Sequence, residues 1–282
     1  MIIYYDNEEN KIKSYRDHKI IVENTFKLSI DDVINLGGGK ITQRMHEAIS
    51  LDDEETVNVI NRCIDESVNN YSRFTGFVQK INSYIAKKPL HSGRIVTLDE
   101  REIRQILSDD NYYKYNELGL LEIKDNNIIF PNKSIAKMMT ITGSFLENYL
   151  SLKLLKSGYF DDVKMSCVID FNGSMRKYPI TCEIDCLVIK DNHLLFVSCK
   201  SNKVDTSALN EIKVHNTMFG NELSNPVLCT LDDLDIKNPS VYGKARELGV
   251  AIVDKTDFNN DEVPLRFKEI IDGTFIYTVI EE

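Results

Sequence analysis

The sequence is notable first for what it lacks. It has no tryptophan and no apolar run that approaches the 18 or so residues needed to span a bilayer. It also lacks a basic and then apolar N-terminal stretch of the kind that directs secretion. These absences argue against an integral membrane protein and predict a cytoplasmic one.

Cysteine pairs are also missing. None of the six cysteines forms a Cys-x-x-Cys motif, and most lie in apolar runs, so we expect buried, reduced thiols. A zinc site built from Cys182, Cys186 and Cys199 is geometrically conceivable, but it lacks a fourth ligand at a usual spacing.

Basic residues are fewer than acidic ones, and the formal net charge is -10. A protein that binds long duplex DNA through charge alone would be basic. Any contact with nucleic acid must therefore come from local basic clusters, from a bound metal ion or from a brief catalytic encounter.

What the sequence does contain is a stretch, residues 181–200, with the pattern of two strands joined by a tight turn at Asp191-Asn192. Because side chains alternate along a strand, Glu183 and Asp185 should share one face of the first strand. On the second strand, Ser198 and Lys200 should share one face. The opposite face of the first strand should carry the thiol and apolar side chains of Cys182, Ile184, Cys186 and Val188.

This hairpin predicts two carboxylates beside one lysine. Hard cations such as Mg²⁺ and Mn²⁺ prefer carboxylate oxygens, and water bound to such an ion becomes a nucleophile. The alternative is a solvent-facing hairpin with a surface ion pair worth less than about 1 kcal/mol. The surrounding apolar residues favour a buried sheet, in which uncompensated charges are costly.

The first 140 residues show three different patterns. Residues 1 to about 30 contain extended segments, and residues 52 to about 87 have helical apolar spacing. Residues 91–140 have the helix-helix-hairpin pattern of a winged helix. Its recognition region, 109–114, begins with two acidic residues and has no arginine, which favours a structural spacer over a reader of DNA sequence.

The last 140 residues contain alternating helices and strands. The pattern predicts helices at 143–155, 206–219 and 240–248, and strands at 163–170, 181–190, 193–200, 226–230 and 250–253. The resulting order, α-β-β-β-α-β-α-β, predicts a mixed sheet flanked by helices.

This order of elements resembles the PD-(D/E)XK nuclease fold. Carried over position by position, Glu147 matches the acid of the first helix, Asp185 the acid of the second strand, and Lys200 the lysine of the third strand. The resemblance implies that these three residues are catalytic. It also implies a Mg²⁺ or Mn²⁺ ion held by Asp185 and Glu147, with Glu183 and the backbone carbonyl of Val197 as further ligands.

Three segments match one branch of that fold more closely. Residues 143–147, 182–185 and 196–200 resemble the signatures of CRISPR ancillary nucleases, which join a CARF sensor domain to the nuclease through a winged-helix-like linker. The resemblance covers roughly residues 20–282. It implies a homodimer in antiviral defence that is activated by cyclic oligoadenylate and cuts single-stranded DNA or RNA.

Two features depart from that family. Ser198 stands where the family has a glutamate, so Glu183 or Glu211 must replace the missing carboxylate, or the site is silent. The sensor is also largely missing, because a doubly wound CARF domain needs more than about 100 residues. Residues 1–36 match only its closing hairpin, so we do not expect a complete cyclic-oligoadenylate pocket in this chain. The chain could be a shortened form of a longer protein, or a natural short form with a separate partner that senses cyclic oligoadenylate.

We therefore predict an α/β (α+β) fold with a C-terminal restriction-endonuclease-like mixed sheet. The expected segments are a CARF-like β-hairpin remnant (1–36), a helical linker (37–90), a winged-helix-like domain (91–140) and a nuclease-like domain (141–282). The predicted function is metal-dependent endonuclease activity, and the alternative is a silent module that binds nucleic acid or a defence partner. His193 and His215 could act as general bases, although solvated or capping roles are more common.

Overall fold

The computed structural model describes residues 3–6, 11–14, 17–23, 27–44, 49–141, 143–171, 180–201, 204–220, 224–232, 234 and 238–276. Its N-terminal strands form a three-stranded antiparallel sheet, where the sequence predicted a hairpin remnant. These strands are β1 (Ile3–Asp6), β2 (Lys11–Ser14) and β3 (Ile20–Glu23).

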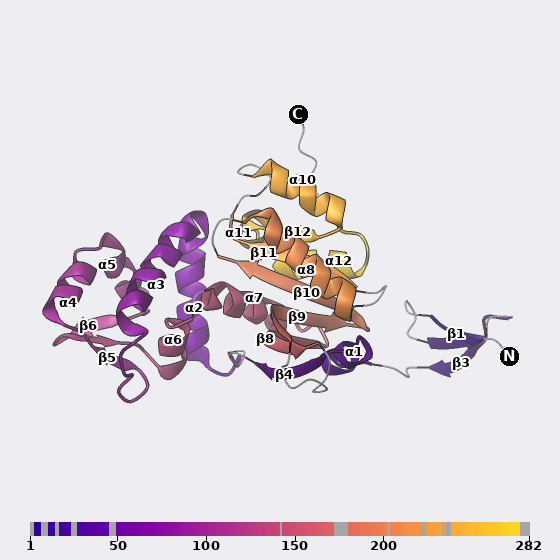
Figure 1. Ribbon diagram of the computed structural model, residues 1–282, viewed down its shortest axis with the longest axis horizontal. Helices are drawn as coiled ribbons and strands as arrows, with labels where there is room; N and C mark the ends of the chain where they lie inside the picture. Colours follow the sequence, from indigo (N-terminus) through magenta and orange to yellow (C-terminus); the bar gives the residue numbers. More distant parts are fainter. Residues whose placement is uncertain are drawn as a thin grey trace.

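A six-stranded mixed sheet lies at the centre of the structure, with the strand order β12-β11-β10-β9-β8-β4 (Figure 1). Strands β4, β8, β9 and β10 are antiparallel neighbours, whereas β10, β11 and β12 run parallel. The strands are β4 (Lys40–Arg44), β8 (Asp162–Asp170), β9 (Thr181–Lys190), β10 (His193–Lys200), β11 (Ser224–Thr230) and β12 (Ala251–Val253). The mixed sheet confirms the predicted fold class.

Helices cover both faces of this sheet. On one face lie α7 (Ser144–Ser157) and α12 (Val263–Ile271), and on the other lie α1 (Ile30–Leu36), α8 (Thr206–Phe219) and α10 (Pro239–Leu248). A short helix, α11 (Lys255–Asn259), precedes α12. We call the two layers of buried side chains the α7-side core, which includes Leu146 and Val197, and the α8-side core, which includes Leu209 and Phe196.

Residues 28–44 belong to this sheet layer. Ile30 and Ile34 of α1 are buried in the α8-side core, and β4 pairs with β8 as an edge strand. The expected boundary at residue 36 therefore falls between two elements that pack on the same sheet. The sequence analysis missed β4 because its five residues, KITQR, carry little apolar character.

The α7-side core continues into the segment of the chain that lies between β4 and α7. Here α2 (Glu54–Ser67), the short helix η1 (Val68–Asn70) and α3 (Tyr71–Ile85) are followed by β5 (Ile95–Thr97), α4 (Glu100–Leu107), α5 (Asp110–Glu117), β6 (Glu122–Lys124), β7 (Asn127–Ile129) and α6 (Lys133–Met138). The strands form a small sheet in the order β5-β7-β6. Thr97 ends β5, and the N-cap of helix α4 is Asp99.

In the described residues no helix is both long and apolar enough to cross a bilayer.

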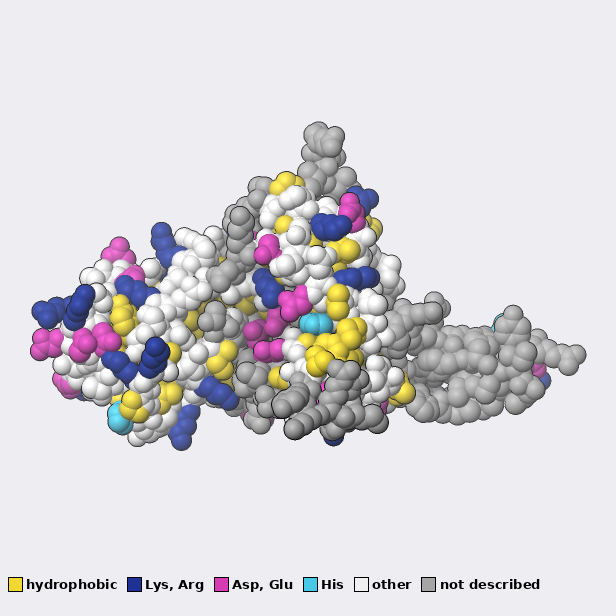
Figure 2. All heavy atoms as spheres, in the orientation of Figure 1, with side chains coloured by type: hydrophobic (Ala, Val, Ile, Leu, Met, Phe, Trp, Pro, Cys, Tyr) yellow, Lys and Arg dark blue, Asp and Glu magenta, His cyan; other side chains and the backbone are white. Residues whose placement is uncertain are grey.

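Charged side chains of both signs are interspersed over the visible surface. On the face shown in Figure 2, Lys and Arg side chains lie among Asp and Glu side chains and do not gather into one basic surface. This distribution agrees with the net charge of -10.

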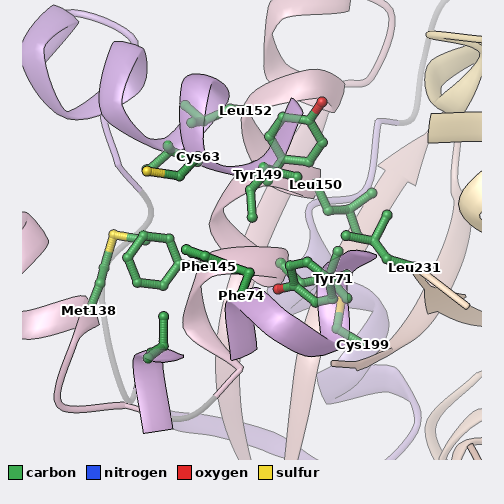
Figure 3. Close-up of a cluster of buried hydrophobic side chains, with 14 of the residues drawn as sticks. Cys63, Tyr71, Phe74, Met138, Phe145, Tyr149, Leu150, Leu152, Cys199 and Leu231 are labelled. Carbon is green, nitrogen blue, oxygen red and sulfur yellow. The ribbon is translucent and has the colours of Figure 1, made fainter. Parts of the chain in front are cut away.

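An aromatic cluster joins α3 to α7 (Figure 3). The ring of Phe74 lies 5.1 Å from the ring of Phe145 and 5.1 Å from that of Tyr115, both in edge-on contacts. All three side chains are buried. Edge-on aromatic pairs add to the stabilisation that burial alone provides. The cluster therefore fixes α3 against the first turn of α7, where Glu147 lies.

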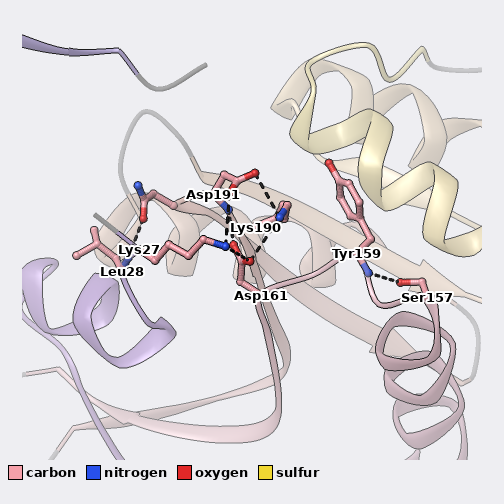
Figure 4. A network of polar contacts seen from close by, with 8 residues as sticks. Lys27, Leu28, Ser157, Tyr159, Asp161, Lys190 and Asp191 are labelled. Atoms are coloured by element: carbon pink, nitrogen blue, oxygen red, sulfur yellow. Dashed lines mark hydrogen bonds and ion pairs between the residues drawn. The ribbon is translucent and has the colours of Figure 1, made fainter. Parts of the chain in front are cut away.

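The hairpin of β9 and β10 is fixed at its turn. Asp191 and Asn192 have φ values of 46° and 69°, as a two-residue type I′ turn requires. Next to the turn, Asp161 accepts hydrogen bonds from Lys27 Nζ at 2.7 Å and from the Asp191 backbone N–H at 2.8 Å (Figure 4). The Asn192 side chain accepts the Leu28 N–H at 2.8 Å. These bonds tie the chain entering α1 to the end of the hairpin opposite Asp185.

Replacing Phe74 with alanine should lower the free energy of unfolding by about 3–5 kcal/mol, because a fully buried aromatic side chain is lost and a cavity remains. Urea denaturation followed by circular dichroism measures the change. The control is Tyr113→Ala, whose side chain is exposed. A loss below about 1 kcal/mol for Phe74→Ala would contradict the role assigned to the cluster.

Candidate active site

Strands β8 and β9 both change the face that they present at the same level of the sheet. In β9, Ile184 packs in the α8-side core, whereas Cys186 packs in the α7-side core. In β8, Val163 lies on the α7 side and Cys167 on the α8 side. A regular strand would place both members of each pair on one face. The expected shared face for Cys182, Ile184, Cys186 and Val188 is therefore wrong.

Ser166 marks the position of this change. Its φ of 45° is in the left-handed region, which non-glycine residues rarely adopt within a strand. The paired residues on either side are Met165 with Cys186 and Cys167 with Ile184, so Ser166 and Asp185 lie opposite each other between them. Backbone conformations of this kind concentrate at functional sites, because the surrounding structure must hold them in place.

Asp185 lies at this irregular level and is half-buried. Its Oδ2 accepts the Cys199 backbone N–H at 2.6 Å and the Ser198 hydroxyl at 3.3 Å. Burial and the negative charge of Glu147 raise the pKa of Asp185 to about 6, against the lowering effects of Lys200 and the two hydrogen bonds. A second carboxylate, that of Glu147, therefore lies close enough to act on the pKa of Asp185.

That second carboxylate comes from α7. Glu147 lies in the first turn of the helix, is 8% exposed and accepts a hydrogen bond from the Ser166 hydroxyl at 3.0 Å. The helix begins after Gly143, whose φ is 88°, and a Cβ at Gly143 would lie 3.3 Å from Glu147 Oε1. Glycine at position 143 thus permits the left-handed backbone conformation and leaves space for the Glu147 carboxylate. Ser166 links the irregular strand to this acid.

The remaining candidates line a hollow of about 250 Å³ between β9, β10 and α8. Ser198 is buried, and Lys200 reaches the hollow from the end of β10. On α8, Glu211 is exposed and His215 is buried, with a His215 pKa lowered by burial. The described residues that line the hollow are Glu183, Ile184, Asp185, Val197, Ser198, Lys200, Glu211, Ile212 and His215.

The sequence-based candidates separate into three groups. Glu147, Asp185 and Lys200 share one electrostatic environment, since both other groups act on the pKa of Asp185. Glu183 also lines the hollow but is exposed. His193 lies at the opposite end of β10 from Lys200, and burial lowers its pKa. Among the described residues, no group of three or more His, Cys, Asp and Glu side chains has the arrangement of a complete metal site.

Sequence reasoning did not find Ser166 or the Cys199 N–H. The only sequence signal for Ser166 is a small polar residue within a largely apolar strand. The Cys199 N–H belongs to the backbone, so the identity of the side chain gives no sign of its role.

Comparisons with known proteins support the fold. No family model matches the chain, and neither does any curated protein. Protein VC1899 from Vibrio cholerae is structurally similar, with a TM-score of 0.70 at 12% identity over 97% of this chain and 70% of that one. Can2 from Sulfobacillus thermosulfidooxidans, in complex with cyclic tetra-adenylate, has a TM-score of 0.58 at 12% identity over 92% of this chain and 67% of that one. At such low identity these likenesses show the fold alone.

Asp185→Asn should raise the free energy of unfolding at pH 8 by up to about 3 kcal/mol, since a shift of two pKa units costs about this much in the ionised folded state. The folded state binds the proton more tightly than the unfolded state does. The wild type therefore loses this stability as the pH rises from about 4 to about 6. The variant should show a flatter profile in that range and little gain at pH 4.

The contrasting control is Asp161→Asn. Burial raises the pKa of Asp161, but the Lys27 and Asp191 hydrogen bonds and the nearby lysines lower it overall. Its ionised form therefore stabilises the fold, and the variant should be destabilised at pH 8. Urea unfolding midpoints measured from pH 4 to pH 8 test whether Asp185→Asn stabilises the protein and whether Asp161→Asn destabilises it. An Asp185→Asn variant no more stable than the wild type at pH 8 would contradict the raised pKa of Asp185.

Proposed function

We propose that this chain is a metal-dependent nuclease, a hydrolase that cuts phosphodiester bonds of DNA, RNA or both, in CRISPR or antiviral defence. The observation that carries the proposal is the carboxylate pair of half-buried Asp185 and buried Glu147 within electrostatic range of Lys200. An acid pair of this kind, with the pKa of one member raised, favours a functional site over a structural ion pair.

The residues present fit a Mg²⁺ or Mn²⁺ ion. The donors are hard carboxylate oxygens, and burial together with the Glu147 charge raises the pKa of Asp185, so a bound cation would favour its ionised form. Asp185 and Glu147 would hold the ion, with the Val197 carbonyl and Glu183 as further ligands. Mg²⁺ commonly keeps several waters when only one or two carboxylates bind it, so three acidic side chains are not required.

The ion would supply an activated water and neutralise charge on the phosphate. Lys200 would orient that water or stabilise the charge that develops on the phosphate. The Cys199 N–H and Ser198 hydroxyl hold the Asp185 carboxylate in position. Ser166 does the same for Glu147.

The proposed biological setting rests on the family resemblance and on the fold. Can2, to which this chain is structurally similar, was solved with cyclic tetra-adenylate. We propose a homodimer that acts on single-stranded DNA or RNA in a response to cyclic oligoadenylate. The absence of one broad basic surface on the face in Figure 2 favours a single strand over a long duplex.

A silent, binding-only module is the second candidate, and Ser198 is the observation that favours it. Its hydroxyl donates to Asp185 in the position where the related nucleases supply a carboxylate. A hydroxyl contributes no negative charge to a metal ion. Such a module would bind nucleic acid or a defence partner without cutting it.

Wild type with Mn²⁺ should cleave single-stranded oligonucleotides, and Asp185→Ala should reduce the rate by about 10²-fold or more because the buried metal ligand is lost. Ser198→Glu should raise the rate, since it adds a carboxylate beside Asp185. Denaturing gel electrophoresis of labelled DNA and RNA, with and without EDTA, measures both effects.

Glu117→Ala is the matched control, because Glu117 is an exposed acid on α5 outside the hollow. Its rate should equal that of the wild type. Cleavage by Ser198→Glu but not by the wild type would establish the silent module instead. Cleavage that survives both EDTA and Asp185→Ala would contradict the nuclease site proposed here.

A further inference from the structure

Two free cysteines lie opposite each other in the central sheet, next to the candidate active site. Cys199 of β10 and Cys229 of β11 are directly paired in the register of these parallel strands. Both side chains are buried in the α7-side core, so they lie on the same face of the sheet. Neighbouring strands are about 4.8 Å apart, and a disulfide needs a Cα–Cα separation of about 4.4–6.8 Å. The backbone therefore already has the spacing that a disulfide requires.

The two thiols are also in contact. A hydrogen bond between them, followed by burial, raises the pKa of Cys199 well above its usual value. Cys186 of β9 lies within electrostatic range of Cys229, but its partner on β10 is Val197. Within the described strands, Cys199 and Cys229 are the only cysteines paired directly with each other. Each is therefore the nearest partner for the other in a disulfide.

A small oxidant has a route toward this pair. Cys229 is fully buried, whereas Cys199 is 8% exposed. Cys199 lies beside Tyr71 (Figure 3), and Tyr71 lines a hollow of about 130 Å³ together with Ser201 and Thr230. A hollow of this size holds several water-sized molecules. Hydrogen peroxide is little larger than water, so it can enter the hollow and reach the end of β10 that carries Cys199.

Cys199 also positions a residue of the candidate active site. Its backbone N–H donates to Asp185 Oδ2 at 2.6 Å, and Lys200 follows it in β10. The Thr230 hydroxyl, next to Cys229, donates to the Lys200 carbonyl at 3.0 Å. A covalent bond between the two sulfurs draws β10 and β11 together at this point. It therefore displaces the N–H that holds the Asp185 carboxylate.

We propose that a peroxide oxidises Cys199 and Cys229 to a disulfide, and that this modification weakens metal binding at Asp185. With hydrogen peroxide, the Cys199 thiol attacks one oxygen and becomes a sulfenic acid as one water leaves. The Cys229 thiol then attacks the sulfenic sulfur, and a second water leaves. The two thiols lose two electrons and two protons, which reduce one peroxide to two waters. The effect on the metal rests on the proposed nuclease function, whereas the disulfide does not.

The thiol chemistry makes this oxidation slow. The thiolate is the form that attacks an oxidant, so a thiol with a raised pKa reacts slowly. The reduced pair is therefore the resting form, in agreement with the thiols expected from the sequence. The disulfide accumulates only under sustained oxidation.

Peptide mapping by mass spectrometry tests the disulfide. The folded full-length protein is incubated in millimolar hydrogen peroxide, its remaining thiols are alkylated with N-ethylmaleimide in urea, and the product is digested without reduction. A cross-linked peptide that contains Cys199 and Cys229 should appear, with four of the six cysteines alkylated. Six alkylated cysteines, or a cross-link between another pair such as Cys186 and Cys229, would overturn the proposal.

Three variants sharpen the map. Cys229→Ser should abolish the cross-link without changing the residue whose N–H holds Asp185. Cys199→Ser should abolish it as well, and it serves if Cys229→Ser fails to fold. The matched control is Cys63→Ser, because Cys63 is also fully buried but lies on α2, outside the central sheet. The cross-link should persist in that variant.

Isothermal titration with Mn²⁺, after removal of the peroxide, measures the effect on the site. Oxidised wild type should bind Mn²⁺ about tenfold more weakly than reduced wild type, since loss of a group that positions a metal ligand costs about 10–100-fold in affinity. Dithiothreitol should restore the affinity, and peroxide should not change that of Cys229→Ser. Equal affinity before and after cross-linking would overturn the effect on Asp185. A reduced wild type that binds no Mn²⁺ would instead refute the metal site of the proposed function, while the peptide map would still decide the disulfide.

Discussion

The placing of two carboxylates, buried Glu147 and half-buried Asp185, within electrostatic range of each other is the constraint on which the rest of this site depends. Asp185 and Glu147 come from different elements, and burial together with the negative charge of Glu147 raises the pKa of Asp185 to about 6. Such an arrangement lowers stability unless a proton or a cation is bound. The fold maintains it with three donors: the Ser198 hydroxyl and Cys199 N–H on Asp185, and the Ser166 hydroxyl on Glu147.

Those donors are in place because the sheet is irregular at one level. The positive φ of Ser166 accompanies the change of face in β8 and β9, and it directs the Ser166 hydroxyl to Glu147. The aromatic contact between Phe74 and Phe145 then fixes α7 against α3.

The sequence predicted the features that depend on local chemistry. The strand positions, the Asp191-Asn192 turn and the order of elements from α7 to β12 all follow from propensity and spacing, and the structure confirms them. The resemblance to a nuclease fold then selected Glu147, Asp185 and Lys200. The change of face at Ser166 could not be predicted, because serine has no preference for positive φ and tertiary packing imposes it. The short polar strand β4 was missed because its pairing with β8 is a long-range contact.

Isothermal titration of Mn²⁺ into the protein at pH 6, in two buffers of different ionisation enthalpy, tests the central claim most directly. If Asp185 and Glu147 hold the ion, binding must displace the proton that Asp185 carries at its raised pKa. The account predicts that wild type releases about half a proton per ion at this pH, and that Asp185→Asn neither binds Mn²⁺ comparably nor releases the proton. Binding of equal affinity in Asp185→Asn, or no binding by the wild type, would contradict it.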